Sequence, residues 1–397
     1  MLWFFKPRVI VQKPTGERYY PKLVNASTLE SYRYSDPAHA KIEVVTNRSP
    51  YTSDYINPLE ADDIVRLQVS CRMSPKEKYV YVDLFEGRIE TISADYNTKN
   101  NTTLSCKGHI NAATKHLIEE TKTWTGTVEA RAILSYFVKD TASPKPTRLT
   151  WLNQAPYVDQ TGTINFTDST SAYATKADQT YLSSIFEDME KQAGYDWKIG
   201  TKAVYTSGGL LDKVYLTWKL LDTVATDKYK AIQGTARYLS SQFNVSIEDQ
   251  VTQYKVKGDT PSGGTQYTGT YIDNTAAAAY GRKTDVDVFT QLQSNATCAG
   301  IAAGVGPSRI DAVISGTIKL IGTPEARPGD MVSVKAKSTE LNGAEISGDF
   351  TVFRVRHNIT PNSYTTEIHV GKVVVDAYDL IRNIKKTASV SKCNQVK

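Results

Sequence analysis

Cysteine is scarce in this sequence, and the cysteines that occur lie far apart. Among 397 residues there are four, Cys71, Cys106, Cys298 and Cys393, and no two are arranged as Cys-x-x-Cys. Structural zinc sites need cysteines at short spacings, and disulfide-stabilised domains need many of them. The sequence therefore argues against a zinc site and against a disulfide framework, and it favours synthesis in a reducing compartment.

Long apolar segments are also missing. The first residues, MLWFFKPR, reach a charge at Lys6, so their apolar stretch is too short for the core of a signal peptide. No apolar run elsewhere approaches the roughly 20 residues that a membrane-spanning helix needs. We expect neither Sec-dependent export nor a membrane-spanning segment.

Charge of one sign is not concentrated anywhere. The 47 Lys and Arg residues and the 42 Asp and Glu residues leave a net charge of +5, and acids and bases are interspersed. A nucleic-acid-binding surface usually shows as a basic run or patch, and none stands out. A chain of this length can bury sizeable cores in about two to four domains, so we expect a soluble globular protein.

What the sequence does contain is β-strand patterning near its C-terminal end. In EARPGDMVSVKA (325–336), a turn at residues 328–330 precedes Val332 and Val334, which alternate with polar residues as in a half-buried strand. Two later segments alternate in the same way: FTVFRVRHNI, with Phe353, Val355, His357 and Ile359 on one face, and YTTEIHV, with Tyr364, Thr366, Ile368 and Val370 on one face. We predict three sequential strands that form a meander.

A similar pattern occurs near the N-terminus. In EADDIVRLQVSC (60–71), Asp63 stands where Asp330 stands, and apolar residues alternate after it. Downstream, residues 85–108 parallel residues 350–371, since each segment has a Phe, a strand, an Asn-containing turn, a Thr-rich strand and a Gly. We interpret the two segments as copies of a duplicated antiparallel β-unit.

Between and around these copies the sequence predicts further elements. Helical spacing of apolar residues occurs in these segments: 110–118 (Ile110, Ala113, Leu117, Ile118), EARAILSYFVKD (129–140), a helix capped by Asp178 and ended by Gly194 (Tyr181, Leu182, Ile185, Phe186, Met189), a helix capped by Asp227 (Tyr229, Ile232, Ala236, Leu239, Phe243), and an Ala-rich stretch over residues 275–303. YDWKIG, VYLTWKLL and QYKVKG are strand candidates.

We therefore predict a mainly β protein with an α+β insertion, in which two similar small β-barrel domains, of the kind found in tail tubes, flank an α+β domain. The predicted parts are a first β-barrel domain with a closing helix (1–125), an α+β middle domain (126–244), a second β-barrel domain with an Ala-rich helix (245–375) and a C-terminal tail (376–397).

This order of domains resembles the baseplate or tail hub proteins of tailed phages, the late-control hub family, and of related contractile injection machines. In that family a Tyr-Gly pair precedes a helix, and a Pro-Gly-Asp turn precedes strands that end in V-x-H and Y-x-T. The matching residues here are LFEGRIE after the first acid-led strand, Tyr280 and Gly281 in AAAAYGRKT, residues 328–330 in RPGDMVSV, Val355 and His357, and Tyr364 and Thr366. The resemblance spans nearly the whole chain and is weakest between residues 125 and 230.

The resemblance implies a structural role. In such hubs each subunit carries two alike barrels, so a homotrimer presents six and joins a sixfold tail tube to a threefold spike or tip, leaving a channel for the genome. Implied partners are the tail tube protein, a spike or tail-tip protein and other baseplate proteins, with DNA passing only transiently. The implied location is the virion tail or baseplate after synthesis in the host cytoplasm. We expect no cofactor and no enzyme activity; the alternatives are a cell-wall carbohydrate hydrolase of the tail and a monomeric binding module.

Acidic residues raise the hydrolase alternative, which needs two carboxyl groups about 5 to 10 Å apart across a sugar cleft. Glu187, Asp188 and Glu190 follow one another in a predicted helix, where a solvated helix face is the simpler interpretation. Asp285 and Asp287 could contribute to a metal site, but the spacing of the sequence indicates no further ligands for them.

Histidines and glycines give no stronger signal. His109 and His116 lie near Cys106, but seven residues span about 10 Å of helix, too far for one zinc ion. His357 on an apolar strand face is more typical of a core histidine than of a base. AGIAAGVGPSR, with Gly300, Gly304 and Gly306, lacks the Lys and Ser or Thr of a phosphate loop and predicts a helix end and turn, and GDTPSGGTQYTG is more typical of a hairpin tip than of a lid. The sequence predicts no catalytic, cofactor-binding or metal-binding residue.

Overall fold

The computed structural model describes most of the chain. The described residues are 4–31, 38–45, 59–72, 80–95, 101–138, 148–151, 158, 163–165, 172–175, 179–193, 197–245, 251–261, 264–289, 292–309, 314–337 and 345–372. The predicted tail (376–397), the predicted caps Asp178 and Gly194, and Cys393 lie outside them. In this part of the chain, no helix is both long enough and apolar enough to cross a membrane.

The N-terminal part of the chain forms an antiparallel unit, called here the first β-unit. Its strands are β1 (Phe4–Gln12), β2 (Arg18–Tyr19), β3 (Leu23–Ser31), β4 (His39–Val45), β5 (Ile64–Arg72), β6 (Val82–Asp95) and β7 (Asn101–Gly108). Strands β5, β6 and β7 form a meander, and β4 joins it beside β7. In β7 every second residue is buried, among them Leu104 and Cys106, so one face of the strand packs in the core as the alternation predicts.

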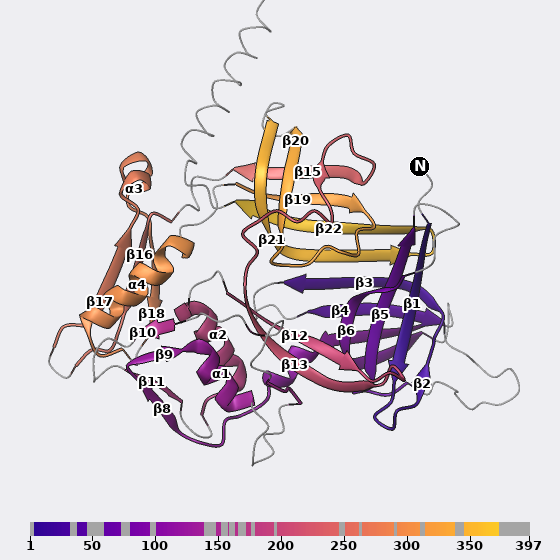
Figure 1. Ribbon diagram of the computed structural model, residues 1–397, viewed down its shortest axis with the longest axis horizontal. Helices are drawn as coiled ribbons and strands as arrows, with labels where there is room; N and C mark the ends of the chain where they lie inside the picture. Colours follow the sequence, from indigo (N-terminus) through magenta and orange to yellow (C-terminus); the bar gives the residue numbers. More distant parts are fainter. Residues whose placement is uncertain are drawn as a thin grey trace, which may run out of the picture.

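The C-terminal part of the chain forms the second β-unit. Its strands are β14 (Ala231–Ile232), β15 (Tyr238–Val245), β19 (Ile314–Ile321), β20 (Met331–Lys337), β21 (Glu345–Thr360) and β22 (Ser363–Lys372). The predicted meander is present as β20, β21 and β22. Figure 1 shows the yellow strands of this unit above the indigo strands of the first β-unit. The predicted mainly β fold, with two similar units, is confirmed.

The predicted faces of β21 are correct only beyond a β-bulge at Phe353. The pairing register shifts between Val352 and Arg354, and Val352 and Val355 are both buried while Phe353 is only partly so. A bulge inserts one residue, so the direction in which the side chains point reverses there. The prediction that Phe353 shares a face with Val355 is therefore wrong, whereas the face formed by Val355, His357 and Ile359 is correct.

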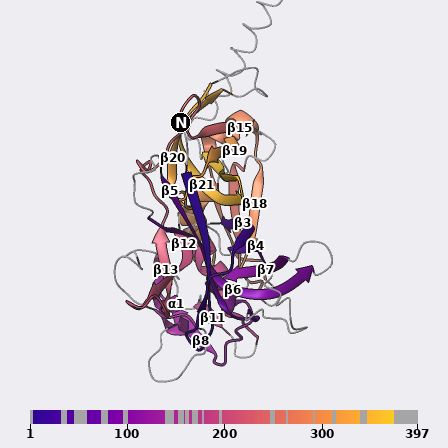
Figure 2. The same cartoon turned by 90° about the vertical axis from the view of Figure 1, so that its right-hand side faces the viewer.

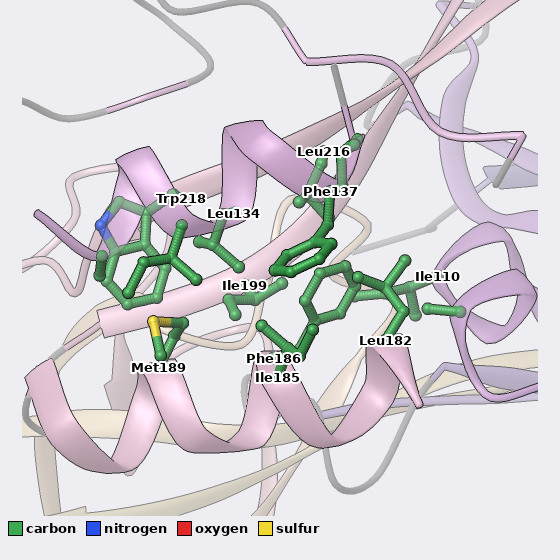
Figure 3. Packing of buried hydrophobic residues seen from close by; sticks show 14 of the residues in the cluster. Ile110, Leu134, Phe137, Leu182, Ile185, Phe186, Met189, Ile199, Leu216 and Trp218 are labelled. Carbon is green, nitrogen blue, oxygen red and sulfur yellow. The ribbon is translucent and has the colours of Figure 1, made fainter. Parts of the chain in front are cut away.

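Residues between the units form a region of helices, short strands and one longer hairpin, called here the middle region. Its elements are a 3-10 helix (His109–Ala113), β8 (Lys122–Thr125), β9 (Thr127–Glu129), α1 (Ala130–Val138), β10 (Thr163–Asn165), β11 (Ala172–Thr175), α2 (Leu182–Ala193), β12 (Trp197–Tyr205) and β13 (Leu211–Leu220). Helices α1 and α2 and strands β12 and β13 match predicted elements. Figure 3 shows Leu134 and Phe137 of α1 directed toward Phe186 of α2, with Trp218 of β13 beside them.

A further module lies in sequence between β15 and β19. It comprises β16 (Gln253–Lys257), β17 (Thr268–Ile272), α3 (Asn274–Tyr280), β18 (Thr284–Val288) and α4 (Asn295–Arg309). Figure 1 shows this orange module apart from the second β-unit, on the side of the middle region. Its buried residues Tyr254, Val256 and Cys298 belong to the same hydrophobic cluster as those of α1 and α2. The module is therefore inserted into the second β-unit but packs on the middle region; the predicted domain boundaries stay a prediction.

The helix predicted over Tyr229 to Phe243 is wrong. Strand β14 pairs with β20, and β15 pairs with β19. Between these strands Gly234 has a φ of 89°, a left-handed conformation that no right-handed helix contains. Tyr229 and Phe243 are both buried in the core of the second β-unit. Their spacing fits a helix by coincidence, because pairing with distant strands overrides a local periodicity.

Two other predicted helices are shorter than expected. The stretch over residues 275–303 is interrupted, since α3 ends before Gly281, whose φ is 79°, and β18 pairs with β16 before α4 begins. The three glycines expected at a helix end and turn lie inside α4. The helix expected over residues 110–118 is only the 3-10 turn, after which Leu117 bridges to Tyr181.

Candidate assembly interface

Two acidic residues noted in the sequence, Asp63 and Asp330, hold equivalent turns. Oδ2 of Asp63 accepts a hydrogen bond from the amide of Glu60 at 2.9 Å, and Oδ2 of Asp330 accepts one from the amide of Arg327 at 2.9 Å. Both acidic side chains are buried, at 1% and 9% exposure. Each carboxylate therefore binds the backbone three residues before it and stabilises the turn that starts the next strand.

The backbone of the two turns is also the same. The equivalent hydrogen bonds are Asp62 N to Ile89 O (2.8 Å) and Gly329 N to Val352 O (2.7 Å), then Ile89 N to Asp63 O (2.9 Å) and Val352 N to Asp330 O (2.8 Å). Asp62 and Gly329 both have positive φ, at 75° and 90°. The duplication inferred from the sequence is therefore a structural repeat, in which Ile89 is equivalent to Val352.

The repeat extends over five strands of each unit. The order β3, β4, β7, β6, β5 in the first β-unit matches the order β15, β19, β22, β21, β20 in the second. Two β-bulges match as well: those after Leu23 and Tyr238, and those after Ile89 and Val352. Because bulges are specific local features, two matching bulges indicate two copies of one architecture.

Inside the chain, the two β-units meet edge to edge. Strand β3 pairs antiparallel with the second half of β21, from Arg354 opposite Ser31 to Ile359 opposite Ala26. The hydroxyl of Ser27 donates to Oδ1 of Asn358 at 2.8 Å across this junction. The pairing joins both units into one 13-stranded sheet, and Figure 2 shows them stacked one above the other.

Within the part of the chain that the structure describes, the equivalent edges elsewhere in the two units are open. Strand β15 corresponds to β3, and within the described residues it pairs with β19 alone. Residues 91–95 of β6 correspond to the part of β21 that holds β3, and among the described strands they pair with β7 alone. Figure 2 shows the ends of β6 and β7 extending away from the body of the molecule. A sheet edge with unpaired backbone groups is a site for pairing with another strand.

The β12–β13 hairpin ties the two units together beside the junction. Nζ of Lys198 donates to the carbonyl of Pro328 at 2.7 Å, in the turn of the second β-unit. At the other end of the hairpin, the Arg66 guanidinium lies 3.6 Å from the ring centroid of Tyr205, and Leu211 N donates to Oε1 of Gln12 at 3.0 Å. The hairpin therefore contacts both units and supports their relative orientation.

A charged cluster lies where the hairpin meets both units. Arg66 pairs with Asp83 at 2.8 Å and with Glu86 at 3.4 Å, and Arg327 of the second unit donates to the carbonyl of Asp83 at 2.7 Å. Burial and the nearby charge of Asp83 raise the pKa of Glu86 to about 7, against the opposing effects of a hydrogen bond with Tyr205 and of the two arginines. Asp83, Glu86 and Arg327, with Lys198, line a cleft of about 210 Å³.

The acidic residues considered for catalysis do not converge on this cleft. Glu187 and Asp188 are neighbours on α2, each half-buried, and Glu190 follows in the same helix. Oδ2 of Asp287 accepts a hydrogen bond from the buried Tyr254 hydroxyl at 2.9 Å, and Asp285 accepts one from a backbone amide of its own strand. The contact of Asp287 joins β18 to β16, and that of Asp285 lies within β18.

The histidines and cysteine considered as ligands are mostly buried. Burial lowers the pKa of His109 to about 4 and that of His357 to about 3, and it raises the pKa of the Cys106 thiol to about 12. Nδ1 of His357 lies 3.0 Å from the Tyr364 hydroxyl, in the core. Within the described residues, no three His, Cys, Asp or Glu side chains gather as metal ligands would.

The residues that matter for assembly were only partly visible in the sequence. The alternation of β21 beyond its bulge and the turn acids were apparent, but nothing local indicates that Ser27 lies beside Asn358. Arg66 and Tyr205 were also missed as partners, since an isolated arginine and tyrosine carry no spacing signal. Both contacts join residues far apart in the sequence, so only the tertiary structure identifies them.

No protein-family model matches the chain, and no curated protein matches it. Solved structures do match. The tail protein from Neisseria meningitidis MC58 has a TM-score of 0.59 at 10% identity, with 94% of this chain and 99% of that chain covered. The 43 kDa tail protein of prophage MuSo2 from Shewanella oneidensis has a TM-score of 0.57 at 12% identity, with 92% and 98% covered. Prophage tail protein gp18 from Listeria monocytogenes EGD-e has a TM-score of 0.54 at 12% identity, with 96% and 99% covered.

At such identities the likeness shows the fold. It covers nearly the full length of this chain and of each phage tail protein. The chain therefore has the architecture of phage tail proteins, which confirms, for the fold, the resemblance noted in the sequence.

Proposed function

We propose that the chain is the structural hub of a viral tail or baseplate, a homotrimer that adapts a sixfold tail tube to a threefold spike or tip. One observation carries this proposal: the chain contains two equivalent β-units that meet edge to edge, through β3 and β21. A junction that forms once within a chain can form again between chains when equivalent edges are open. Three copies would then present six similar units around one axis.

The same chain also carries features that occur once. The β16–β18 module with α3 and α4 interrupts only the second β-unit, and the β12–β13 hairpin lies against a charged cluster that is built mainly on the first. In a ring of three copies, the repeated strands would approximate sixfold symmetry and these additions would be threefold. This division supports the role of a symmetry adaptor, because a sixfold and a threefold partner can each find matching contacts on it.

The ring has consequences for partners and location. Its sixfold side would contact the tail tube protein, its threefold side a spike or tail-tip protein, and its outer surface other baseplate proteins. A ring around an axis leaves a channel, through which the genome would pass with only transient contact. The hub would reside in the virion tail or baseplate, after synthesis in the host cytoplasm, and would act by geometry and not as an enzyme.

The alternatives have less support. A cell-wall carbohydrate hydrolase needs two carboxyl groups facing each other across a cleft, whereas Glu187 and Asp188 are neighbours on one helix. A monomeric binding module gives no role to two equivalent units whose equivalent edges are open among the described residues. Neither alternative rests on an observation as specific as the repeat.

The oligomeric state tests the proposal. We expect mass photometry or sedimentation of the purified chain, alone or mixed with its tube or spike partner, to show three copies per particle. A chain that is strictly monomeric in the assembled particle would contradict the hub. A turbidity assay on cell-wall glycans tests the hydrolase, and turnover that is lost in Glu187→Gln would favour that alternative instead.

A further inference from the structure

We propose that the chain pairs with a second copy of itself through residues 242–245 of β15 and residues 92–95 of β6 in the neighbouring copy. This inference rests on the proposed function and names the surfaces that would close the ring. The contact is antiparallel and head-to-tail, because it joins an edge of the second β-unit to a different edge of the first. A head-to-tail contact of this kind can close into a ring.

On one side of this contact, β6 is the equivalent of β21. Ile92 lies opposite Leu104 as Val355 lies opposite Ile368, at the same distance beyond the matching bulges. The half of β21 beyond its bulge holds β3 inside the chain. The corresponding part of β6 is the open one, so the first β-unit offers the same backbone edge without an occupant among the described residues.

On the other side, β15 is the equivalent of β3. Phe243 lies opposite Gly316 as Thr28 lies opposite Ala40, and both strands carry a bulge nearer their starts. Strand β3 has β4 on one edge and β21 on the other. Strand β15 has β19 on one edge, and the described residues place no strand on its second edge.

The register of the internal junction predicts the register between copies. Inside the chain, the opposed pairs are Val355 with Glu30, Arg356 with Leu29, His357 with Thr28, and Asn358 with Ser27. The equivalent pairs between copies are Ile92 with Val245, Ser93 with Asn244, Ala94 with Phe243, and Asp95 with Gln242. A shift by one residue would place the apolar faces on opposite sides of the sheet, so this register is specified.

The sequence of β15 supports its use as a pairing edge. It reads YLSSQFNV and contains no Lys, Arg, Asp, Glu or Pro. Exposed edge strands in monomeric proteins usually carry such residues, which discourage pairing with other chains. Ser240, Gln242 and Asn244 are exposed on one face, while Phe243 packs in the core. An edge without protection is expected where a second copy covers it.

The exposed pair Ser93 and Asn244 allows a direct test. In a background with Cys71→Ser and Cys393→Ser, we combine Ser93→Cys with Asn244→Cys and oxidise mildly. Opposed Cα atoms of antiparallel strands lie about 4.5 to 5.5 Å apart, within reach of a disulfide. We expect covalently linked dimers and trimers on a non-reducing gel, and none from either single-cysteine variant.

The matched control shifts the register. Ser93→Cys combined with Ser240→Cys places the second thiol four residues along the same exposed face, about 13 Å away. This pair should not cross-link. Equal cross-linking of both pairs, or absence of the link between residues 93 and 244 in a chain that does associate, would overturn the proposed register.

A charge exchange gives an independent readout without oxidation. Ser93→Lys with Asn244→Lys places like charges opposite each other, whereas Ser93→Glu with Asn244→Lys places opposite ones. We expect the first variant to raise the dissociation constant for self-association about fivefold by sedimentation, and the second to restore it, because directly opposed charges across strands interact at this scale. Equal behaviour of the two variants would count against the contact.

The outcomes separate this inference from the proposed function. If no variant and no wild-type preparation associates, even with tube or spike partner, the hub itself fails. If copies associate but neither the cross-link nor the charge exchange responds, the hub stands and only the contact between β15 and β6 is wrong.

Discussion

In the first β-unit the opposed pair Arg66 and Glu86 lies beneath the β12–β13 hairpin, whereas the equivalent pair in the second, Ser333 and Asp349, lies at the surface. The backbone positions are the same, but the coverage differs. In the first unit the pair is an ion pair, and burial raises the pKa of Glu86. In the second unit the exposed Ser333 hydroxyl donates a hydrogen bond of 2.8 Å to the Asp349 carboxylate. The two copies of the repeat therefore keep the same strand pairing and register, whereas the side chains on their strand faces differ.

The turns that start β5 and β20 differ in a second way. Both need a residue with positive φ, which Gly329 adopts without cost and Asp62 adopts with some strain. Asp62 compensates by pairing with Arg88 at 3.3 Å and with Arg148 at 2.7 Å. The same backbone requirement is met by the conformational freedom of glycine in one unit, and in the other by ion pairs to Arg88 of β6 and to Arg148 of the middle region.

A third difference is an exchange of positions on one strand face. Phe85 and Gly87 in β6 correspond to Gly348 and Phe350 in β21, since both pairs oppose equivalent residues of β5 and β20. Both aromatic residues are buried. Each unit thus fills its core with one phenylalanine from this face, but from positions two residues apart.

The largest effect is expected from adding a side chain at Gly87, where the second unit has Phe350. In Gly87→Ala the new Cβ would lie 2.1 Å from the carbonyl oxygen of Lys107 and 2.7 Å from Cζ of Phe85. The backbone oxygen can move only with the sheet, so we expect the free energy of unfolding in urea to fall by about 3 kcal/mol. Gly300→Ala is the control, because its Cβ meets nothing within 4 Å in α4; a similar loss there would remove the steric explanation.

The next effect tests the turns. Gly329→Val combines a φ of 90° with a Cβ only 3.1 Å from Cδ2 of Leu221, and we expect a loss of about 2 to 3 kcal/mol and defective assembly. Asp62→Gly should change stability by less than about 1 kcal/mol, since relief of strain offsets the lost exposed ion pairs. Chemical denaturation measures both; a neutral Gly329→Val would show that this turn tolerates strain as Asp62 does.

The ion pair of Arg66 and Glu86 predicts that the stability of the protein depends on pH. The folded-state pKa of Glu86 is raised above its ordinary 4.5, to about 7, so the protonated form is favoured by folding and its contribution to stability is lost as pH rises from about 4.5 to about 7. Between pH 5 and 7 the loss should be about 2 kcal/mol. Glu86→Gln should flatten this part of the stability profile and Asp349→Asn should leave it unchanged; an unaltered slope in Glu86→Gln would assign the dependence to another group.

The smallest effect compares the two turn acids. Asp63→Ala removes one acceptor of a backbone amide, whereas Asp330→Ala also removes the acceptor of the buried Tyr229 hydroxyl at 2.9 Å. We expect losses of about 1 and about 2 kcal/mol, because a buried donor without a partner adds its own penalty. Tyr229→Phe in the Asp330→Ala background should recover part of the difference; no recovery would show that the hydroxyl is not the cause.

Some of this architecture could be predicted from residues close in sequence. The acid-led turns, the alternation in β7 and β22, and helices α1 and α2 follow local rules that the structure obeys. The bulge at Phe353, the strand β15 and the strand β18 could not be predicted in this way. Their conformation depends on which distant strand lies alongside, and a helical spacing of apolar residues does not exclude a strand.

The sequence by itself determined that the chain has two acid-led β-meanders and that positions such as Gly329 must turn. Only the tertiary structure decided that β3 seals the edge of β21, that the module between β15 and β19 packs elsewhere, and that two matching edges have no partner strand among the described residues. The physical reason is that alternation specifies which face of a strand is buried, whereas the backbone hydrogen bonds along its edges are alike for every sequence and do not specify which strand will pair there. Partner choice between strands is therefore settled by packing of the whole chain.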